Sequence, residues 1–159
     1  MDKTSLPYRP CAGVMLMNRD GQVFVGQRLD STLEAWQMPQ GGIDEGEEAI
    51  DAAVRELREE TGVMPDKVRL IAEAPGEFLY DLPDDMIGRI WKGKWRGQRQ
   101  RWFLFGFEGE DGDIDIATPE PEFRAWRWAD PADLPTMIVP FKKTLYEQVL
   151  AAFAEHLHR

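Results

Sequence analysis

Three glutamates in the first half of the chain are spaced so that their carboxylates can act together. Glu56, Glu59 and Glu60 stand at i, i+3 and i+4, so on an α-helix they project from one face with neighbouring Cβ atoms about 5–6 Å apart. Charges at this spacing repel one another, and a divalent cation would relieve the repulsion. Carboxylate oxygens without Cys or His beside them favour Mg²⁺, with Mn²⁺ as a possible substitute. The alternative is an acidic helix face that contacts only solvent.

The residues around these glutamates form one longer pattern over 23 positions. In order, it contains Gly41, Glu47, Arg55-Glu56-Leu57, Glu59-Glu60 and Gly62-Val63. Average residue usage gives a chance match below about one in a million per starting position. The pattern resembles the Nudix box, the signature of Nudix hydrolases, and every fixed position of that box is filled.

The resemblance covers nearly the whole chain and is to the bacterial RNA pyrophosphohydrolase and dinucleoside polyphosphate hydrolase branch of this family. Residues 29–35 and 82–96 match it least. The segments that carry it outside the box are Tyr8-Arg9-Pro10, Trp36-Gln37-Met38-Pro39-Gln40-Gly41-Gly42, Gly97-Gln98-Arg99-Gln100-Arg101-Trp102-Phe103, Pro121-Glu122-Phe123, Trp126-Arg127-Trp128 and Phe141-Lys142.

The resemblance implies a fold, a reaction and a metal site. The implied fold is the Nudix fold of the α/β (α+β) class, with mixed β-sheets between helices, in a single domain over residues 1–159. The implied reaction is Mg²⁺-dependent hydrolysis of a phosphoanhydride bond. The implied metal ligands are the carboxylates of Glu56, Glu59, Glu60 and Glu122 and the backbone carbonyl of Gln40.

The predicted catalytic group consists of Glu56, Arg55 and Glu59. Glu56 is the first choice for the general base, with a role as metal ligand as the alternative. Arg55 is expected to orient a carboxylate through a charge-assisted hydrogen bond, and the competing interpretation is a surface ion pair with Asp51 or Glu59. Glu47 either favours the positive start of the helix or braces the preceding loop.

Five residues are expected to bind the substrate. Arg9 and Arg28 match positions that contact phosphates or bases in this branch, and guanidinium groups suit both tasks. Phe141 would stack on a base, with Lys142 beside it for phosphate and Tyr80 as a second ring contact. Phe141 also begins the apolar stripe of the last helix, so a core position is the alternative.

Composition and charge limit the class of protein. The 159 residues are 43% hydrophobic and 30% charged, which is typical of a folded globular chain. The net charge of −10 opposes broad nucleic-acid binding. Residues 86–101, however, contain six basic residues and no acid, which predicts either an RNA-guiding surface or a solvated basic hairpin. One cysteine and the lack of an apolar leader or membrane segment favour the cytoplasm.

The elements that would position these residues follow from hydrophobic periodicity. We expect a β-hairpin from 11–17 and 22–28, a loop at 36–42, and helices at 47–61 and 141–156. Further strands are expected at 67–73, 77–81, 100–107 and 122–129. On the first helix, the apolar stripe of Ile50, Val54 and Leu57 points roughly 120° away from the acids, so core packing and acid presentation should not compete.

The resemblance implies release of pyrophosphate from the 5′ end of triphosphorylated RNA, directly or through a diphosphorylated intermediate. Hydrolysis of a dinucleoside polyphosphate of the Ap4A type uses the same chemistry. The alternatives are a noncatalytic nucleotide-binding regulator and an ADP-ribose or nucleotide-sugar pyrophosphatase. No membrane partner is expected, and the sequence identifies no protein partner.

Overall fold

A mixed sheet of eight strands forms the centre of the computed structural model, which describes residues 5–29, 35–87 and 93–157. The main path of the sheet runs β3-β2-β1-β7-β5, with β4 paired to β1, β6 to β7 and β8 to β2. The strands are β1 (Tyr8–Met17), β2 (Val23–Arg28), β3 (Trp36–Gln37), β4 (Gln40–Gly42), β5 (Val68–Glu73), β6 (Phe78–Asp81), β7 (Gly97–Phe107) and β8 (Phe123–Ala129). The central pair, β1 and β7, is parallel over ten positions.

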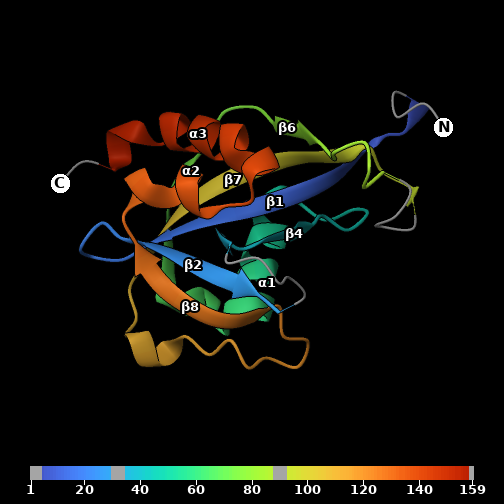
Figure 1. The fold of residues 1–159 in the computed structure, drawn as a ribbon. Coiled ribbons are helices and arrows are strands. Elements are labelled where there is room, and N and C mark those ends of the chain that lie inside the picture. The colour runs from blue at the N-terminus through green and yellow to red at the C-terminus, as the bar shows by residue number, and fades with distance from the viewer. Residues whose placement is uncertain (1–4, 30–34, 88–92, 158–159) are drawn as a thin grey trace.

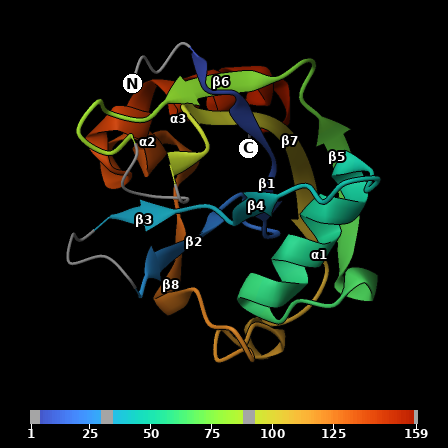
Figure 2. The same ribbon diagram turned by 90° about the vertical axis from the view of Figure 1, so that its right-hand side faces the viewer.

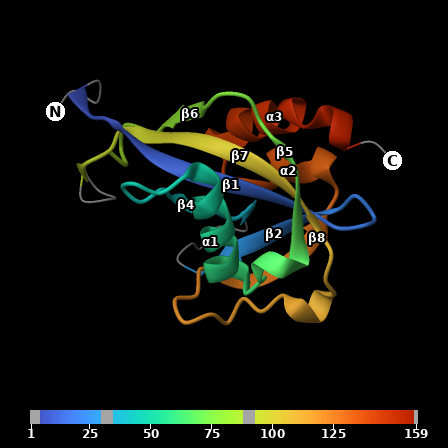
Figure 3. The same cartoon turned by 180° about the vertical axis from the view of Figure 1, so that it is seen from behind.

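Helices lie on both sides of this sheet. Helix α1 (Ala49–Thr61) covers one side, and α2 (Leu134–Met137) with α3 (Lys143–Ala152) covers the other (Figures 1 and 3). Helix α3 packs against β6 (Figure 2). Single 3₁₀ turns occupy Pro65–Lys67, Asp111–Asp113, Pro131–Asp133, Pro140–Lys142 and Ala154–His156. The predicted α+β class, with strands between helices, is confirmed.

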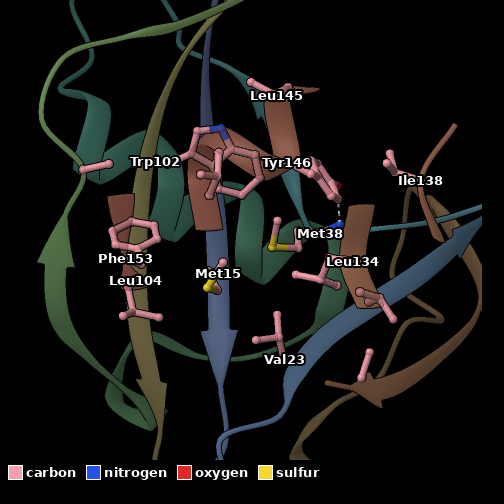
Figure 4. Packing of buried hydrophobic residues seen from close by; sticks show 14 of the residues in the cluster. Met15, Val23, Met38, Trp102, Leu104, Leu134, Ile138, Leu145, Tyr146 and Phe153 are labelled. Atoms are coloured by element: carbon pink, nitrogen blue, oxygen red, sulfur yellow. Dashed lines mark hydrogen bonds between the residues drawn. The ribbon is translucent and has the colours of Figure 1, made fainter. Parts of the chain in front are cut away.

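Alternation along the central strands divides the core into two layers. Met15, Trp102 and Leu104 point toward α2 and α3, where Tyr146 and Phe153 meet them (Figure 4). The intervening residues Val14, Leu16, Phe103 and Phe105 point toward α1. This period-two burial fits strands covered on both faces.

The predicted elements are recovered with shifted ends. The prediction of a loop at 36–42 was wrong in part, because two short strands lie there. Gln40–Gly42 pair with Cys11–Gly13, and Trp36–Gln37 pair with β2. Helix α1 begins at Ala49 instead of residue 47, and the last helix is shorter than predicted, with a 3₁₀ turn on each side. The strand predictions are confirmed, with β1 and β7 each beginning three residues earlier than expected.

Among the described residues, no helix combines the length and the apolar character that a bilayer crossing requires.

Candidate active site

Helix α1 packs closely against the sheet and carries three of the predicted acids. Ala52, Ala53 and Leu57 are buried on its inner face, whereas Ile50 and Val54 only pack at the edge of the core. Gly62, in the left-handed conformation at φ 74°, ends the helix. The expectation that the core and the acids do not compete was wrong, because Glu60 lies on the buried side and is only 3% exposed.

The Glu60 carboxylate is buried, and its hydrogen bonding and the nearby positive charge do not fully offset the cost of that burial. Its Oε2 has no hydrogen-bond partner among the described residues. Burial raises the pKa of Glu60 well above its ordinary value, and the negative charges of Glu56 and Glu122 raise it further. The charge of Arg28 and a backbone hydrogen bond from Gln40 oppose these effects. A buried oxygen of this kind marks a place where a cation would be stabilised.

Arg55 connects the acids to the loop before the helix. Its Nε and Nη2 donate to the two carboxylate oxygens of Glu47, both at 2.9 Å, and Nη2 also donates to the Gly42 carbonyl at 2.9 Å. Its Nη1 donates to Glu56 at 2.8 Å and to Glu59 at 3.2 Å. Arg55 thus contacts Glu56, as an orienting role requires, and also forms the pair with Glu59 of the competing interpretation. Glu47 braces the loop through this network. The bond to Glu47 is the main cause that raises the pKa of Arg55.

Glu56 lies against Gly41, where any larger residue would displace its carboxylate. A Cβ on Gly41 would fall 2.2 Å from the Glu56 carboxyl carbon, far inside van der Waals contact. Burial raises the pKa of the Glu56 carboxyl, while the hydrogen bond and positive charge of Arg55 lower it. The first glycine of the box therefore gives this carboxylate its space beside β4.

A prediction follows for Glu47, whose pKa is lowered to about 2 by its hydrogen bonds with Arg55 and with the Asp44 amide. A lowered carboxyl pKa stabilises the fold above the ordinary value of 4.5, and this contribution is lost as the pH falls toward 2. We expect Glu47→Gln to lower the Tm at pH 7 by about 3 °C. The difference should shrink between pH 4.5 and 3 in thermal denaturation of both proteins. A difference that is constant with pH would contradict the ion pair as its cause.

Glu122, the residue immediately before β8, reaches the same region. The amide of Leu29 donates to its backbone carbonyl at 2.9 Å, which ties this position to the end of β2. Its side chain, 44% exposed, lies 3.5 Å from Arg28 Nη2. Two residues remote in sequence thus meet beside the acids of α1.

A cavity of about 550 Å³ lies among these acids. Sequence reasoning missed part of its wall, including Thr118 and Glu120, because residues 114–122 have no periodic pattern. The Thr118 Oγ1 and the Gln40 Oε1 are buried without hydrogen-bond partners among the described residues. The lining residues are Glu56, Arg58, Glu59, Glu60, Gly62, Met64, Thr118, Pro119, Glu120 and Glu122.

The acidic side chains are not arranged around one point, as the ligands of a single metal ion would be. Within residues 5–29, 35–87 and 93–157, no three His, Cys, Asp or Glu side chains lie close enough to hold one metal ion. Glu56 and Glu59 share the Arg55 guanidinium, and Glu59 is 52% exposed. The hard oxygen donors and the unpaired Glu60 oxygen nevertheless fit Mg²⁺ or Mn²⁺ in chemical type. The metal-ligand roles remain predictions.

A second group of predicted residues lies together between β6 and α3. The Tyr80 and Phe141 rings are 6.0 Å apart, and the Lys142 ammonium lies 5.3 Å from the centre of Tyr80. Burial raises the pKa of Tyr80, while the positive charges of Arg9 and Arg28 lower it. Phe141 is 36% exposed and lies outside both core layers, so it does not take the core position considered above.

The basic segment is largely neutralised where it is described. Arg96 contacts Asp81 at 3.2 Å, Arg99 contacts Glu77 at 2.8 Å, and Arg101 contacts Glu73. These acidic partners lie outside residues 86–101, in β5, β6 and the turn between them, so the charge pattern of that segment alone does not reveal them. Arg89, Trp91 and Lys92 lie outside the described residues.

Comparisons with known proteins identify the family of the chain. The NUDIX domain family model matches residues 7–149. An RNA pyrophosphohydrolase of Sphingopyxis alaskensis is 62% identical over 153 residues, covering 96% of this chain and 97% of that protein. An RNA pyrophosphohydrolase of Roseobacter denitrificans is 57% identical, and the match covers 96% of this chain and 95% of that protein.

Solved structures share the fold. An E. coli dihydroneopterin triphosphate pyrophosphohydrolase has a TM-score of 0.69 at 24% identity, covering 89% of this chain and 96% of that one. A C. elegans Ap4A hydrolase in a binary complex has a TM-score of 0.63 at 17% identity, with coverage of 91% and 98%. With the filled box and the match over most of its length, the chain belongs to the Nudix family.

Proposed function

We propose that this protein is an RNA pyrophosphohydrolase that releases pyrophosphate from triphosphorylated RNA 5′ ends, with the whole chain acting as one catalytic domain in the cytoplasm, where its RNA substrate lies. One observation carries the proposal: the cavity places the acids of the box beside Arg28, which meets Glu122 at 3.5 Å. Relatives above 50% identity named RNA pyrophosphohydrolase support the substrate class.

The acids around the cavity would hold the cations that neutralise a polyphosphate. Glu56, Glu59, Glu60 and Glu122, with the Gln40 carbonyl, would hold Mg²⁺ or Mn²⁺. When bound, such ions neutralise phosphate charge and lower the pKa of a water molecule. Arg55 fixes the direction of the Glu56 carboxylate through its 2.8 Å bond, and Glu56 accepts a proton from the attacking water as general base. Both assignments are part of the proposal.

The nucleotide would lie toward the exposed ring of Phe141. Its base stacks on that ring, with Tyr80 and Lys142 beside it. Arg9 and Arg28 supply positive charge near Tyr80 and fork onto phosphate oxygens. Because Arg28 also meets Glu122, it joins the base-binding end to the acidic cavity.

Dinucleoside polyphosphate hydrolysis is a second candidate, and the exposed Phe141 ring favours it since a second nucleoside needs a stacking surface. A noncatalytic regulator fits less well, because binding alone does not require four carboxylates around the cavity. ADP-ribose and nucleotide sugars also carry a base that can stack on Phe141, so cleavage of ADP-ribose is compared directly in the test.

The proposal is tested by incubating the protein with Mg²⁺ and, separately, triphosphorylated RNA, diadenosine tetraphosphate and ADP-ribose. We expect pyrophosphate and monophosphorylated RNA as the fastest products, measured by chromatography of labelled substrates. EDTA serves as the control for metal dependence. Faster cleavage of ADP-ribose, or no cleavage of RNA, would reject the assignment.

A further inference from the structure

A series of hydrogen bonds runs along one face of β7. Trp102 Nε1 donates to Gln100 Oε1 at 2.7 Å, and Gln100 Nε2 donates to Gln98 Oε1 at 2.6 Å. The three residues alternate along the strand, so their side chains share one face. Each is at most 1% exposed. A polar series this deeply buried requires an explanation beyond packing.

Trp102 is held firmly at the inner end of the series. A Cβ on Gly13, its partner across the β1–β7 pair, would fall 2.4 Å from the indole, so the glycine provides the space that the ring fills. Tyr146 packs edge-on against the indole with centroids 6.1 Å apart. Figure 4 shows the indole nitrogen on the ring edge opposite Met15 and Leu104. The position of the donor is therefore fixed.

The indole sets the direction of both amides. An indole nitrogen only donates, whereas a glutamine amide has an accepting end and a donating end. Gln100 must turn its oxygen to Trp102, which leaves its nitrogen to donate to Gln98. Gln98 must then keep its oxygen toward Gln100, so its Nε2 lies at the outer end and can only donate. Turning over either amide would place two donors, or two acceptors, in contact in the core.

Gln98 lies between two residues of the proposed nucleotide site. In the sheet register its partners are Arg9 on β1 and Tyr80 on β6. Register partners share a face of the sheet, so this row of three lies beneath the place where Phe141 and Lys142 meet Tyr80.

We infer that Gln98 determines specificity by donating a hydrogen bond to an acceptor on the nucleobase that stacks on Phe141, such as a carbonyl oxygen or an unprotonated ring nitrogen. Gln100 and Trp102 act as positioning residues that keep this donor from turning over. With 1% exposure, Gln98 offers a ligand one fixed hydrogen bond instead of an adaptable polar surface. The inference rests on the proposed function for the presence of a nucleotide.

The test uses triphosphorylated RNA oligonucleotides in which the first or the second nucleotide is varied through the four bases. Gln98→Met keeps the volume and removes the donor, so we expect kcat/KM for the preferred base to fall about tenfold, mainly through KM, and the base preference to flatten. Trp102→Phe removes the indole donor, so the Gln100 and Gln98 amides can turn over. The base preference should then flatten less than it does in Gln98→Met. In the Gln98→Met background, Trp102→Phe should not change the base preference further.

Trp128→Phe is the matched control, because it also removes an indole hydrogen bond, to Asp111 Oδ1 at 3.0 Å, but in the other core layer. Its base preference should equal that of the unchanged protein. Thermal denaturation of every variant separates lost folding from lost recognition. If Trp102→Phe does not fold, the comparison of Gln98→Met with the unchanged protein still decides.

Two results would overturn the inference alone: RNA cleavage with no base preference, or a preference that Gln98→Met leaves intact. A protein that cleaves no triphosphorylated RNA would overturn the proposed function, and the inference with it.

Discussion

Glu56→Gln is expected to reduce kcat for pyrophosphate release by about 10²–10⁴-fold while leaving the fold intact. The amide has nearly the same size, so it fits the space beside Gly41, and its oxygen can still accept the bond from Arg55. It cannot take up a proton at neutral pH, and it carries no charge for a cation. Single-turnover cleavage of triphosphorylated RNA measures the loss, and circular dichroism checks the fold.

The control for this variant is Glu48→Gln. Glu48 precedes the same helix, is exposed and makes no side-chain capping hydrogen bond, so its replacement removes one negative charge outside the cavity. Equal losses in the two variants would show that the effect comes from total charge. Near-normal turnover by Glu56→Gln would remove Glu56 from the chemistry.

Glu60→Gln is expected to make the metal-free protein more stable at neutral pH and to abolish stabilisation by Mg²⁺. The Glu60 carboxylate is buried with no partner for Oε2 among the described residues, and the charges of Glu56 and Glu122 further disfavour its charged form. A neutral amide removes the buried charge, which relieves about 1–3 kcal/mol. For a chain of this size, relief of that cost corresponds to about 3–9 °C in Tm. A more stable and inactive variant is the signature of a residue kept for function.

The pH dependence of this effect has a definite sign. Because burial raises the pKa of Glu60 above 4.5, the fold favours the neutral carboxyl, and its cost appears only as the pH rises above that value. The Tm gain of Glu60→Gln should therefore be small near pH 4.5 and largest at neutral pH in EDTA. Glu59→Gln, at a position 52% exposed, should show no such gain. A gain that does not depend on pH would assign the effect to packing.

Local patterns predicted the helix and the longer strands, because periodicity and end residues are properties of short segments. The 13 residues of α1 and the aromatic run of β7 carry strong signals of this kind. Two- and three-residue strands such as β3 and β4 carry none, since their pairing with β2 and β1 is decided by tertiary contacts.

The sequence predicted which residue types form the site, but it did not predict how deeply each side chain is buried. Helical spacing placed Glu56, Glu59 and Glu60 on one face, but an angle around a helix does not tell how far the sheet covers that face. The burial of Glu60 therefore came only from the structure. The neutralising contacts of Arg99 and Arg101 also join β7 to other parts of the chain, namely Glu77 in a turn and Glu73 in β5. A charge count along one segment does not detect them.

The parallel pairing of β1 with β7 has a consequence for biosynthesis. Tyr8 lies opposite Gly97, so the growing chain cannot complete the middle of its sheet until well over half of it has left the ribosome. Until then α1 has only part of the surface that it later covers, and its acids remain in water. A nascent chain stalled before β7 should be sensitive to protease, and full resistance should arise only after β8 and α3 have also emerged, because they pair with β2 and cover the second core layer.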